Sequence, residues 1–367
     1  MANYGLIGAA IAVVIAALTY GVPLFFAEYF PWRSLLKQRD GKPTVVTKSY
    51  SGRTALITGA NGAYGSRAAK MFAHRDIDTL ILVDVMDCGP LKEEIEAELS
   101  ATKKPKANIL VWKIDMMTFA GCQELGKKAR ELKNLDHVLL TAGILSFKRR
   151  ESPEGWETSI QVNYLSTALV ALFLVPLMKS SPTNLAPPVL TFVTSFGIYP
   201  TSYTLSLPKR GSYLKHLSNN KDGLQQAHQY GRSKALLLYF TRELAARVST
   251  AKGLPQKVTI NSADPGSSWT PLTSPNQDKL IPRLIMNFSA RDPRYGAAVL
   301  VNGASASADA HGQIMQDFDT AAYPPFMERK SGHVAQQRVW EETRAEFEAK
   351  VPEIKSVYEM LHGKSDK

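Results

Sequence analysis

Tyr230 and Lys234 are the residues of this sequence best placed to move a proton. A spacing of four residues puts both side chains on one face of a helix, where the ammonium group can stabilise a phenolate. Such a neighbour lowers the pKa of a tyrosine from about 10 toward the pH at which enzymes work. Because pairs of this kind also occur on helices by chance, the surrounding sequence has to support the interpretation.

Ser195 is a second candidate for the same site. It ends the apolar run VLTFVTS at 189–195, which is typical of a buried strand. Its hydroxyl would therefore lie at the carboxyl edge of a sheet, where α/β folds bind ligands. Asn163 lies in the long helical segment that precedes this strand.

A glycine-rich segment, TGANGAYG at 58–65, follows the first predicted strand and opens the first predicted helix. Gly59 would make the tight turn, Gly62 would let the backbone approach a pyrophosphate, and Gly65 would allow the helix to pack closely on the strand. A glycine-rich turn alone is often only structural. The strand–turn–helix context favours a dinucleotide site.

Asp84 ends the second predicted strand, where a carboxylate can accept hydrogen bonds from the adenosine ribose. A 2′-phosphate would be repelled there, and the next residue, Val85, offers no positive charge, so NAD is favoured over NADP. The alternative is that Asp84 only caps the strand end. Asp115 ends the third strand in the same way and could contact the adenine, although a helix N-cap explains it equally well.

Short β-rich runs alternate with helical patterns through most of the chain, which predicts βαβ units and a parallel sheet. We expect an α/β fold with a doubly wound, seven-stranded sheet and helices on both faces. The strands are predicted at 54–58, 79–85, 108–115, 137–143, 189–195, 257–266 and 312–318. The principal helices are predicted up to 74 and at 92–100, 122–132, 156–178, 230–250, 295–306 and 336–361.

Two long segments, 199–229 and 266–290, interrupt this alternation at the carboxyl ends of strands. Long irregular segments inside a compact domain are usually functional. We expect 266–290 to close over a bulky apolar substrate and 199–229 to form the opposite rim. The apolar contacts would come from Trp269, Leu272, Leu284 and Met286. Alternatively, 266–290 holds a small surface helix and the loops pack on each other or on a membrane, which leaves Ser195 and Tyr230 to touch the substrate.

Residues 5–26 form an apolar stretch without a charged side chain. A helix of this length would extend about 33 Å, enough to cross a hydrocarbon core of about 30 Å. The basic residues that follow would keep the body of the protein in the cytosol. We expect a membrane anchor at the endoplasmic reticulum or the lipid-droplet surface. A cleaved signal peptide, a buried core helix and a hairpin bent at Pro23 within one leaflet are the alternatives.

Composition excludes several classes of protein. The 367 residues are 44% hydrophobic and 21% charged, which rules out a disordered or fibrous chain. Two cysteines exclude a disulfide-rich secreted module, and the seven histidines show no metal-ligand spacing. Anionic headgroups would be the partner for much of the net charge of +11. No nucleic-acid partner is expected, because the basic residues are not interleaved with aromatic ones on a known module.

Taken in their order along the chain, these motifs resemble those of the short-chain dehydrogenase/reductase superfamily. The resemblance covers roughly residues 52–345. The resemblance rests on the glycine-rich segment, Leu140-Thr141-Ala142-Gly143, Asn163, Ser195, the Tyr230/Lys234 pair and Asp264-Pro265-Gly266. The chain looks most like the retinol-dehydrogenase-like branch and related fungal biosynthetic oxidoreductases, through YGRSKALLLYFTRELAARV at 230–248, His311-Gly312 and QRVWEE at 337–342.

The resemblance implies a Rossmann-type fold and hydride transfer between a nicotinamide cofactor and an alcohol or carbonyl compound. Tyr230 would be the general acid/base, Ser195 would orient the substrate oxygen, Lys234 would bind the nicotinamide ribose, and Asn163 would hold a water in the proton relay. With Asp84 and Asp115 from the sequence reasoning above, the expected cofactor-binding set is Gly59, Asn61, Gly62, Tyr64, Gly65, Asp84, Asp115, Ala142, Gly143, Tyr230, Lys234, Pro265 and Gly266.

Three positions depart from the family pattern. Ala63 replaces a glycine of the TGxxxGxG motif, Thr141 replaces the asparagine of Asn-Ala-Gly, and the stretch between Ser195 and Tyr230 is longer than usual. The first two could disturb the phosphate turn and its supporting hydrogen bonds. The longer stretch between Ser195 and Tyr230 would change the walls of the site and not its chemistry.

We therefore expect a membrane-anchored oxidoreductase that prefers NAD and acts on a lipophilic substrate such as a steroid, retinoid, terpenoid or polyketide. The reacting group would be a secondary alcohol or ketone, or alternatively a primary alcohol or aldehyde. The expected organisation is an anchor at 1–30, a basic juxtamembrane linker at 31–51, one catalytic domain at 52–330, and a C-terminal helix and tail at 331–367. A catalytically silent relative that binds nucleotide or a partner protein is the alternative. The sequence is also compatible with a homo-oligomer.

Overall fold

The computed structural model describes residues 32–146, 148–182, 186–219, 228–273, 280–317 and 319–361. The expected anchor at 1–30 lies outside these residues. Within them, one helical stretch, Thr158–Leu177, is long and apolar enough to cross a membrane, but it is almost entirely buried inside the domain. It is therefore a core helix of the fold.

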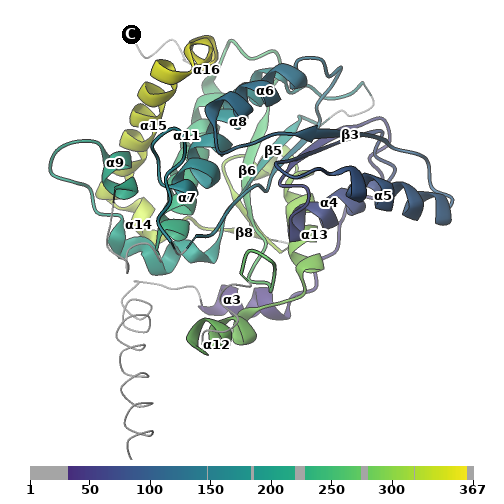
Figure 1. Ribbon diagram of the computed structural model, residues 1–367, viewed down its shortest axis with the longest axis horizontal. Coiled ribbons are helices and arrows are strands. Elements are labelled where there is room, and N and C mark those ends of the chain that lie inside the picture. The colour runs from purple at the N-terminus through teal and green to yellow at the C-terminus, as the bar shows by residue number, and fades with distance from the viewer. Residues whose placement is uncertain are drawn as a thin grey trace, which may run out of the picture.

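A single sheet of eight strands runs through the domain in the order β3-β2-β1-β4-β5-β6-β7-β8 (Figure 1). The strands are β1 Thr54–Thr58, β2 Thr79–Asp84, β3 Asn108–Lys113, β4 His137–Leu140, β5 Val189–Val193, β6 Thr259–Asp264, β7 Ile314–Gln316 and β8 Asp319–Ala321. All neighbouring pairs are parallel except β7 and β8. The strand order reverses between β1 and β4, so the ligand crevice of a doubly wound sheet is expected there.

The sequence prediction of seven strands was one strand short. The eighth, β8, pairs with β7 as a hairpin through a turn in which Asp317 has a positive φ of 48°. A strand of three residues at the edge of a sheet is too short to show an alternating pattern, which explains why periodicity missed it.

Helices cover both faces of the sheet. One face carries α4 Ala63–Ala73, α5 Gly89–Ala101 and α13 Pro293–Gly303, and the other carries α6 Phe119–Ala129, α8 Thr167–Leu174, α11 Gln229–Thr250 and α15 Lys330–Lys350 (Figure 1). Along β1, Ala55 and Ile57 belong to the first of these cores, whereas Leu56 belongs to the second. This alternation is the period of a strand buried on both faces.

The long core helix is irregular at its centre. It consists of α7 Thr158–Ile160, a π-helical stretch at Gln161–Ser166, α8, and a final 3₁₀ turn at Val175–Leu177. Asn163 lies in the π-helical part. Such bulges occur often at functional sites, because they re-aim one side chain without ending the helix.

The segment after Ser195 forms a 3₁₀ helix at Phe196–Thr204 and the short helix α9, Tyr213–Ser218. The remaining elements are α12 Leu280–Ser289, a 3₁₀ turn at Ala308–Ala310 and α14 Pro325–Glu328. The predicted C-terminal helix 336–361 is divided into α15, a 3₁₀ turn at Pro352–Ile354 and α16 Lys355–Leu361. Pro352 explains the division, since proline cannot continue a helix.

The described part of the expected linker, 31–51, contains helix α3, Trp32–Asp40, and α3 lies beside α12 below the sheet (Figure 1). Leu35 and Gln38 are buried, and the Lys37 side chain forms an ion pair with Asp319 of β8. This stretch is therefore a packed part of the domain and not a linker. The sequence alone suggested a linker because local patterns do not reveal contacts with segments more than 200 positions away, such as that of Gln38 with Asp264.

Candidate active site

The glycine-rich loop lies against the loop that follows β4. Gly59 has a positive φ of 66°, and a Cβ atom there would approach the Ala142 nitrogen to 2.8 Å. A Cβ atom on Gly65 would lie 2.2 Å from the Gly59 carbonyl oxygen. Both positions therefore require glycine. Gly62 is the N-cap of α4, so the first turn of this helix presents its N–H groups beside the crevice, as an anionic pyrophosphate requires.

Two departures from the family motif leave this loop intact. The Thr141 hydroxyl donates to the Thr58 carbonyl, and the Ala142 amide donates to the Thr58 hydroxyl at 3.3 Å. Thr141 thus ties the two loops together in place of an asparagine. Ala63 is the first residue of α4, and the Gly62 amide still closes the turn onto the Gly59 carbonyl at 2.9 Å.

A cavity of about 590 Å³ opens at this crevice, where the adenosine half of a dinucleotide would lie. The predicted residues Gly59, Asn61, Gly62, Asp84, Asp115, Ala142 and Gly143 all line it. Val83, Val85, Ile114, Met116, Met117, Ile144 and Val162 add apolar walls. The sequence reasoning missed most of these apolar positions, although several of them directly follow the acidic strand ends.

Asp84 also supports the loop itself. One carboxylate oxygen accepts from the Asn61 amide and the other from the Met86 amide, each at 3.0 Å. The capping role and a role in ribose binding are compatible, because each carboxylate oxygen can accept more than one hydrogen bond. Asp115 accepts from the Met117 amide at 2.8 Å, whereas the N-cap of α6 is Thr118. The alternative explanation of Asp115 as a helix N-cap is therefore wrong.

A second cavity, of about 190 Å³, holds the candidate catalytic residues. Ser195, Tyr230 and Lys234 line it together with Tyr64, Pro265 and Gly266. Thr141 and Gly143 belong to the walls of both cavities, so the two spaces meet at the end of β4. This arrangement would place a nicotinamide ring beside Tyr230 when the adenosine lies over β1 and β2.

Asn163 lies behind this cavity and not in its wall. Its side-chain amide is buried, accepts from the Ile144 amide at 2.7 Å, and donates to the Ile144 carbonyl and the Ser233 hydroxyl at 2.9 Å each. A Cβ atom on Gly143 would lie 3.3 Å from the Asn163 oxygen and 3.9 Å from the Lys234 nitrogen. The asparagine thus holds the segment on which Gly143 sits, within a short distance of Lys234.

Burial controls the ionisation of the catalytic pair. It raises the pKa of the Tyr230 phenol to about 12, and a hydrogen bond with Ser195 offsets only part of this rise. It lowers the pKa of Lys234 to about 8, while the Asp264 carboxylate opposes that shift. The expected lowering of the tyrosine pKa by Lys234 was therefore wrong for the protein chain alone. The ammonium lies 5.9 Å from the centre of the Tyr230 ring and donates to the Val193 carbonyl at 2.7 Å.

The predicted substrate residues divide into two groups. Leu272 and Met286 line the catalytic cavity, as expected. Trp269 does not line it and is only half-buried, and the Leu284 side chain is 57% exposed on α12. Leu145 and Phe196 also line the cavity and were missed, although Phe196 directly follows Ser195 and Leu145 lies two residues after Gly143.

The described part of the 199–229 insertion does not form the opposite rim. None of its residues that the structure describes lines the catalytic cavity. Instead, α9 packs on α15, where the Glu342 carboxylate accepts hydrogen bonds from the Ser212 hydroxyl and from the Tyr213 and Leu214 amides. The alternative surface helix in 266–290 is present as α12.

A nicotinamide cofactor fits the residues present. The Thr194 hydroxyl is buried in the wall of the catalytic cavity and has no hydrogen-bond partner among the described residues. A buried hydroxyl without a partner is costly, and a polar group bound in the cavity would satisfy it. The amide groups of α4 and the carboxylate of Asp84 suit the pyrophosphate and the ribose in the adjoining space.

Comparisons with known proteins agree with this geometry. The family model for short chain dehydrogenases matches residues 53–184. A short chain dehydrogenase of Aspergillus nomiae, rstn4, is 30% identical over 82% of this chain and 81% of its own length. The short chain dehydrogenase/reductase mfmJ of Annulohypoxylon moriforme is 29% identical over 93% of this chain and 96% of its own.

Solved structures share the fold at lower identity. An uncharacterised protein of Mycobacterium paratuberculosis has a TM-score of 0.56 and 18% identity, over 82% of this chain and 95% of that one. The Pseudomonas aeruginosa RhlG/NADP complex has a TM-score of 0.52 and 21% identity, over 72% and 94%.

The chain belongs to the short-chain dehydrogenase/reductase family. It resembles fungal members of that family along most of its length. The protein is an NAD(P)-dependent oxidoreductase.

Proposed function

We propose that this oxidoreductase transfers a hydride between NAD(H) and an alcohol or ketone of a lipophilic molecule, such as a steroid, retinoid, terpenoid or polyketide. The observation that carries the proposal is one cavity whose wall contains Ser195, Tyr230 and Lys234 beside apolar side chains. The cofactor, when bound, supplies or accepts the hydride. All other steps fall to residues of the chain.

In the direction of reduction, Tyr230 donates its phenolic proton to the carbonyl oxygen as that oxygen gains charge. A raised pKa keeps this proton on the phenol at neutral pH. Ser195 orients the oxygen by donating a hydrogen bond. Lys234 would hold the ribose of a bound cofactor. Asn163 holds the backbone at Ile144, beside Gly143, and would support a water that relays the proton.

The preference for NAD is supported by the charges around the adenosine cavity. Asp84 and Asp115 line it, and no lysine or arginine does so among the residues that the structure describes. A 2′-phosphate would therefore meet two carboxylates and no cation. The RhlG structure is a complex with NADP, which is a property of that protein.

A lipophilic substrate is supported by the walls of the catalytic cavity. Leu145, Phe196, Leu272 and Met286 provide apolar surface. Lys234 is the one charged side chain among the described residues that line this cavity, and it is expected to bind the cofactor. A small charged substrate would find no ion-pair partner there.

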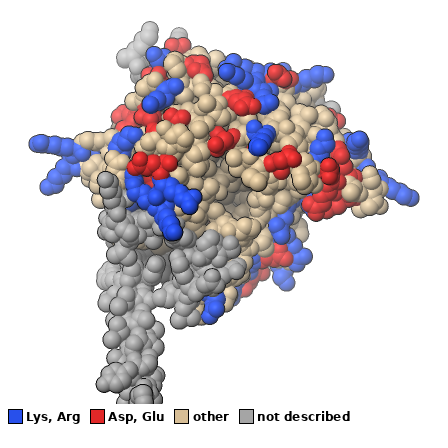
Figure 2. All heavy atoms as spheres, in the orientation of Figure 1, with Lys and Arg blue, Asp and Glu red and all other residues tan. Residues whose placement is uncertain are grey.

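We further propose that residues 1–30 anchor the enzyme to a membrane, at the endoplasmic reticulum or on lipid droplets, with the domain in the cytosol. The apolar sequence at 5–26 is the main support. Two exposed apolar side chains of α12, Leu284 and Phe288, offer a second contact beside α3. On the face in Figure 2, basic and acidic side chains are interspersed, without the continuous basic stripe expected of a nucleic-acid surface.

The substrate class is tested by measuring NADH formation and consumption over a panel of steroid, retinoid and polyketide alcohols and ketones. We expect Leu272→Ala and Met286→Ala each to lower kcat/KM for the best bulky substrate by roughly 10- to 100-fold, because each removes an apolar contact worth about 1–3 kcal/mol. NADH affinity should stay unchanged. Leu284→Ala is the matched control, since that side chain lies outside the cavity.

Unchanged kinetics in both cavity variants would refute apolar recognition by these residues. NADH binding without turnover of any substrate in the panel would instead favour a catalytically silent relative.

A further inference from the structure

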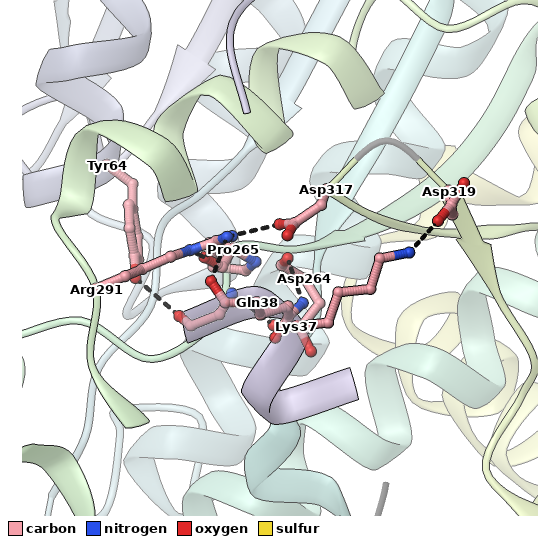
Figure 3. Close-up of polar contacts among 9 residues, drawn as sticks. Lys37, Gln38, Tyr64, Asp264, Pro265, Arg291, Asp317 and Asp319 are labelled. Carbon is pink, nitrogen blue, oxygen red and sulfur yellow. Dashed lines mark hydrogen bonds and ion pairs between the residues drawn. The ribbon is translucent and has the colours of Figure 1, made fainter. Parts of the chain in front are cut away.

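A buried polar cluster lies behind the loop that follows β6 (Figure 3). It joins three parts of the chain that are distant in sequence: α3, the Asp264–Gly266 loop, and the β7–β8 hairpin. At its centre is Arg291, which lies between α12 and α13. The side chains of Arg291 and Asp317 are 2% and 5% exposed.

Arg291 uses its guanidinium group on three partners. Nε and Nη2 both donate to the Pro265 carbonyl, at 3.1 and 2.7 Å. Nη1 donates to the Gln38 carbonyl at 2.8 Å and to the Asp317 carboxylate at 2.6 Å. Only a planar group with several fixed donors can make these bonds together, so lysine is not an equivalent replacement.

The loop that Arg291 holds forms part of the reaction site. Pro265 and Gly266 line the catalytic cavity with Tyr230. Gly266 has a positive φ of 72°, its amide donates to the Asp264 carboxylate at 2.9 Å, and its carbonyl accepts from the Tyr64 hydroxyl at 3.0 Å. The loop is therefore held by Tyr64 of helix α4 on one side and by Arg291 on the other.

Helix α3 rests on the same loop. The Gln38 side chain donates to the Asp264 carbonyl at 3.3 Å, while its backbone carbonyl is the acceptor for Arg291. An exposed ion pair between Lys37 and Asp319 links the same turn of α3 to the hairpin. Because α3 directly follows the proposed anchor, the first packed element after that anchor is bonded to a wall of the catalytic cavity.

We propose that Arg291 is a positioning residue for hydride transfer. Its paired bonds to the Pro265 carbonyl set the position of the Pro265–Gly266 wall, against which cofactor and substrate are held opposite Tyr230. The ion pair with Asp317 neutralises the buried guanidinium and keeps it in place. A misplacement of about 1 Å at such a wall can cost roughly a hundredfold in rate.

Arg291→Lys tests the proposal in the full-length protein. We expect kcat/KM for the best substrate of the panel to fall by roughly 10- to 100-fold at saturating cofactor, well below the Tm of the variant. Hydrogen exchange of the peptide containing Gly266 should become faster. Asp317→Asn should lower Tm but keep kcat/KM within about threefold, because an asparagine still accepts from Nη1 and both bonds to Pro265 remain.

Arg242→Lys is the matched control. The Arg242 guanidinium also donates to a backbone carbonyl, that of Met327 at 3.1 Å, and to a carboxylate, that of Glu328 at 2.6 Å. Neither partner lines the catalytic cavity. This variant should have a lower Tm than the wild type, while its kcat/KM should stay within about twofold of the wild-type value.

The proposal is overturned if Arg291→Lys keeps kcat/KM within about twofold of the wild type, or if Arg242→Lys loses as much activity at equal loss of Tm. It is also overturned if Asp317→Asn loses activity to the same extent as Arg291→Lys, since the ion pair would then be the determinant. If Arg291→Lys does not fold, the double variant Arg291→Met with Asp317→Leu removes both charges and the Pro265 bonds together. Unchanged kcat/KM in that variant would overturn the proposal as well.

Discussion

Replacing Tyr230 by phenylalanine separates proton transfer from packing. The ring lies half-buried in the cavity wall and would keep its contacts, while the phenolic oxygen and its polar interaction with Ser195 would be lost. Loss of one hydrogen bond costs about 1 kcal/mol of stability. Loss of a positioned acid/base lowers turnover by about 10²- to 10⁴-fold, or roughly 3–5 kcal/mol in the transition state. The kinetic effect therefore exceeds the structural one severalfold.

This difference makes the result unambiguous. A domain with a typical stability of about 5–15 kcal/mol stays folded after losing about 1 kcal/mol, so unfolding cannot account for a hundredfold loss of rate. The assay follows NADH absorbance in both directions with the best substrate of the panel. NADH affinity, measured separately by fluorescence titration, should change by less than about threefold, because the variant keeps the aromatic ring and Lys234.

Tyr213→Phe is the matched control for Tyr230→Phe. The Tyr213 phenol is buried on α9, donates to the Leu205 carbonyl at 2.8 Å, and lines neither the adenosine cavity nor the catalytic cavity. It should lose a similar amount of stability with turnover within about twofold of the wild type. Turnover close to that of the wild type in Tyr230→Phe would refute the assignment of Tyr230 as the proton donor.

Three further predictions concern the cofactor, the membrane and the buried carboxylate. Asp84→Ala combined with Val85→Arg should shift the ratio of kcat/KM values from NAD toward NADP, and an unchanged ratio would place ribose selection elsewhere. Deletion of residues 1–30 should leave NADH binding intact while abolishing sedimentation with liposomes; binding that persists at high salt would point to α12 instead. Burial raises the pKa of Asp264 from 3.8 to about 6, so between these values the native state holds one more proton than the unfolded state and stability falls as pH rises. Asp264→Asn should remove this component from urea unfolding curves, and identical pH slopes in the two proteins would contradict it.

The positions of the candidate catalytic residues in one cavity could be predicted because each obeys a local rule. Tyr230 and Lys234 share a helix face through their spacing, and Ser195 lies two residues after the end of strand β5. Gly59 stands where a positive φ and a neighbouring backbone exclude any side chain. These rules act within a few residues of sequence. A parallel sheet then places the ends of its strands at one edge, which brings these residues together.

The apolar lining of the catalytic cavity was less predictable, because it depends on how a helix docks. The apolar residues of 266–290 were all plausible wall residues, yet Leu272 and Met286 line the cavity while Leu284 is turned to the surface. The difference arises from the packing of α12 on α3, where the Arg39 guanidinium lies 5.2 Å from the centre of the Phe288 ring. No pattern within the segment encodes that contact.

The ionisation of the catalytic pair also depends on distant residues. A lysine four positions away suggested a lowered tyrosine pKa, but burial of both groups raises the pKa of Tyr230 and lowers that of Lys234. The Asp264 carboxylate opposes the shift in Lys234, and it is itself attracted by Arg291. Spacing alone could not predict this outcome.

The same strand end therefore serves both the chemistry and the position of the cavity wall. Asp264 favours the charged form of Lys234, and its neighbour Pro265 receives the paired bonds of Arg291. These two buried cations thus each have an acidic neighbour, Asp264 for Lys234 and Asp317 for Arg291, as buried charges require. Although the two pairs meet at one loop, they act separately: Asp264 affects the ionisation of Lys234, whereas Asp317 neutralises Arg291, whose bonds to Pro265 hold the wall.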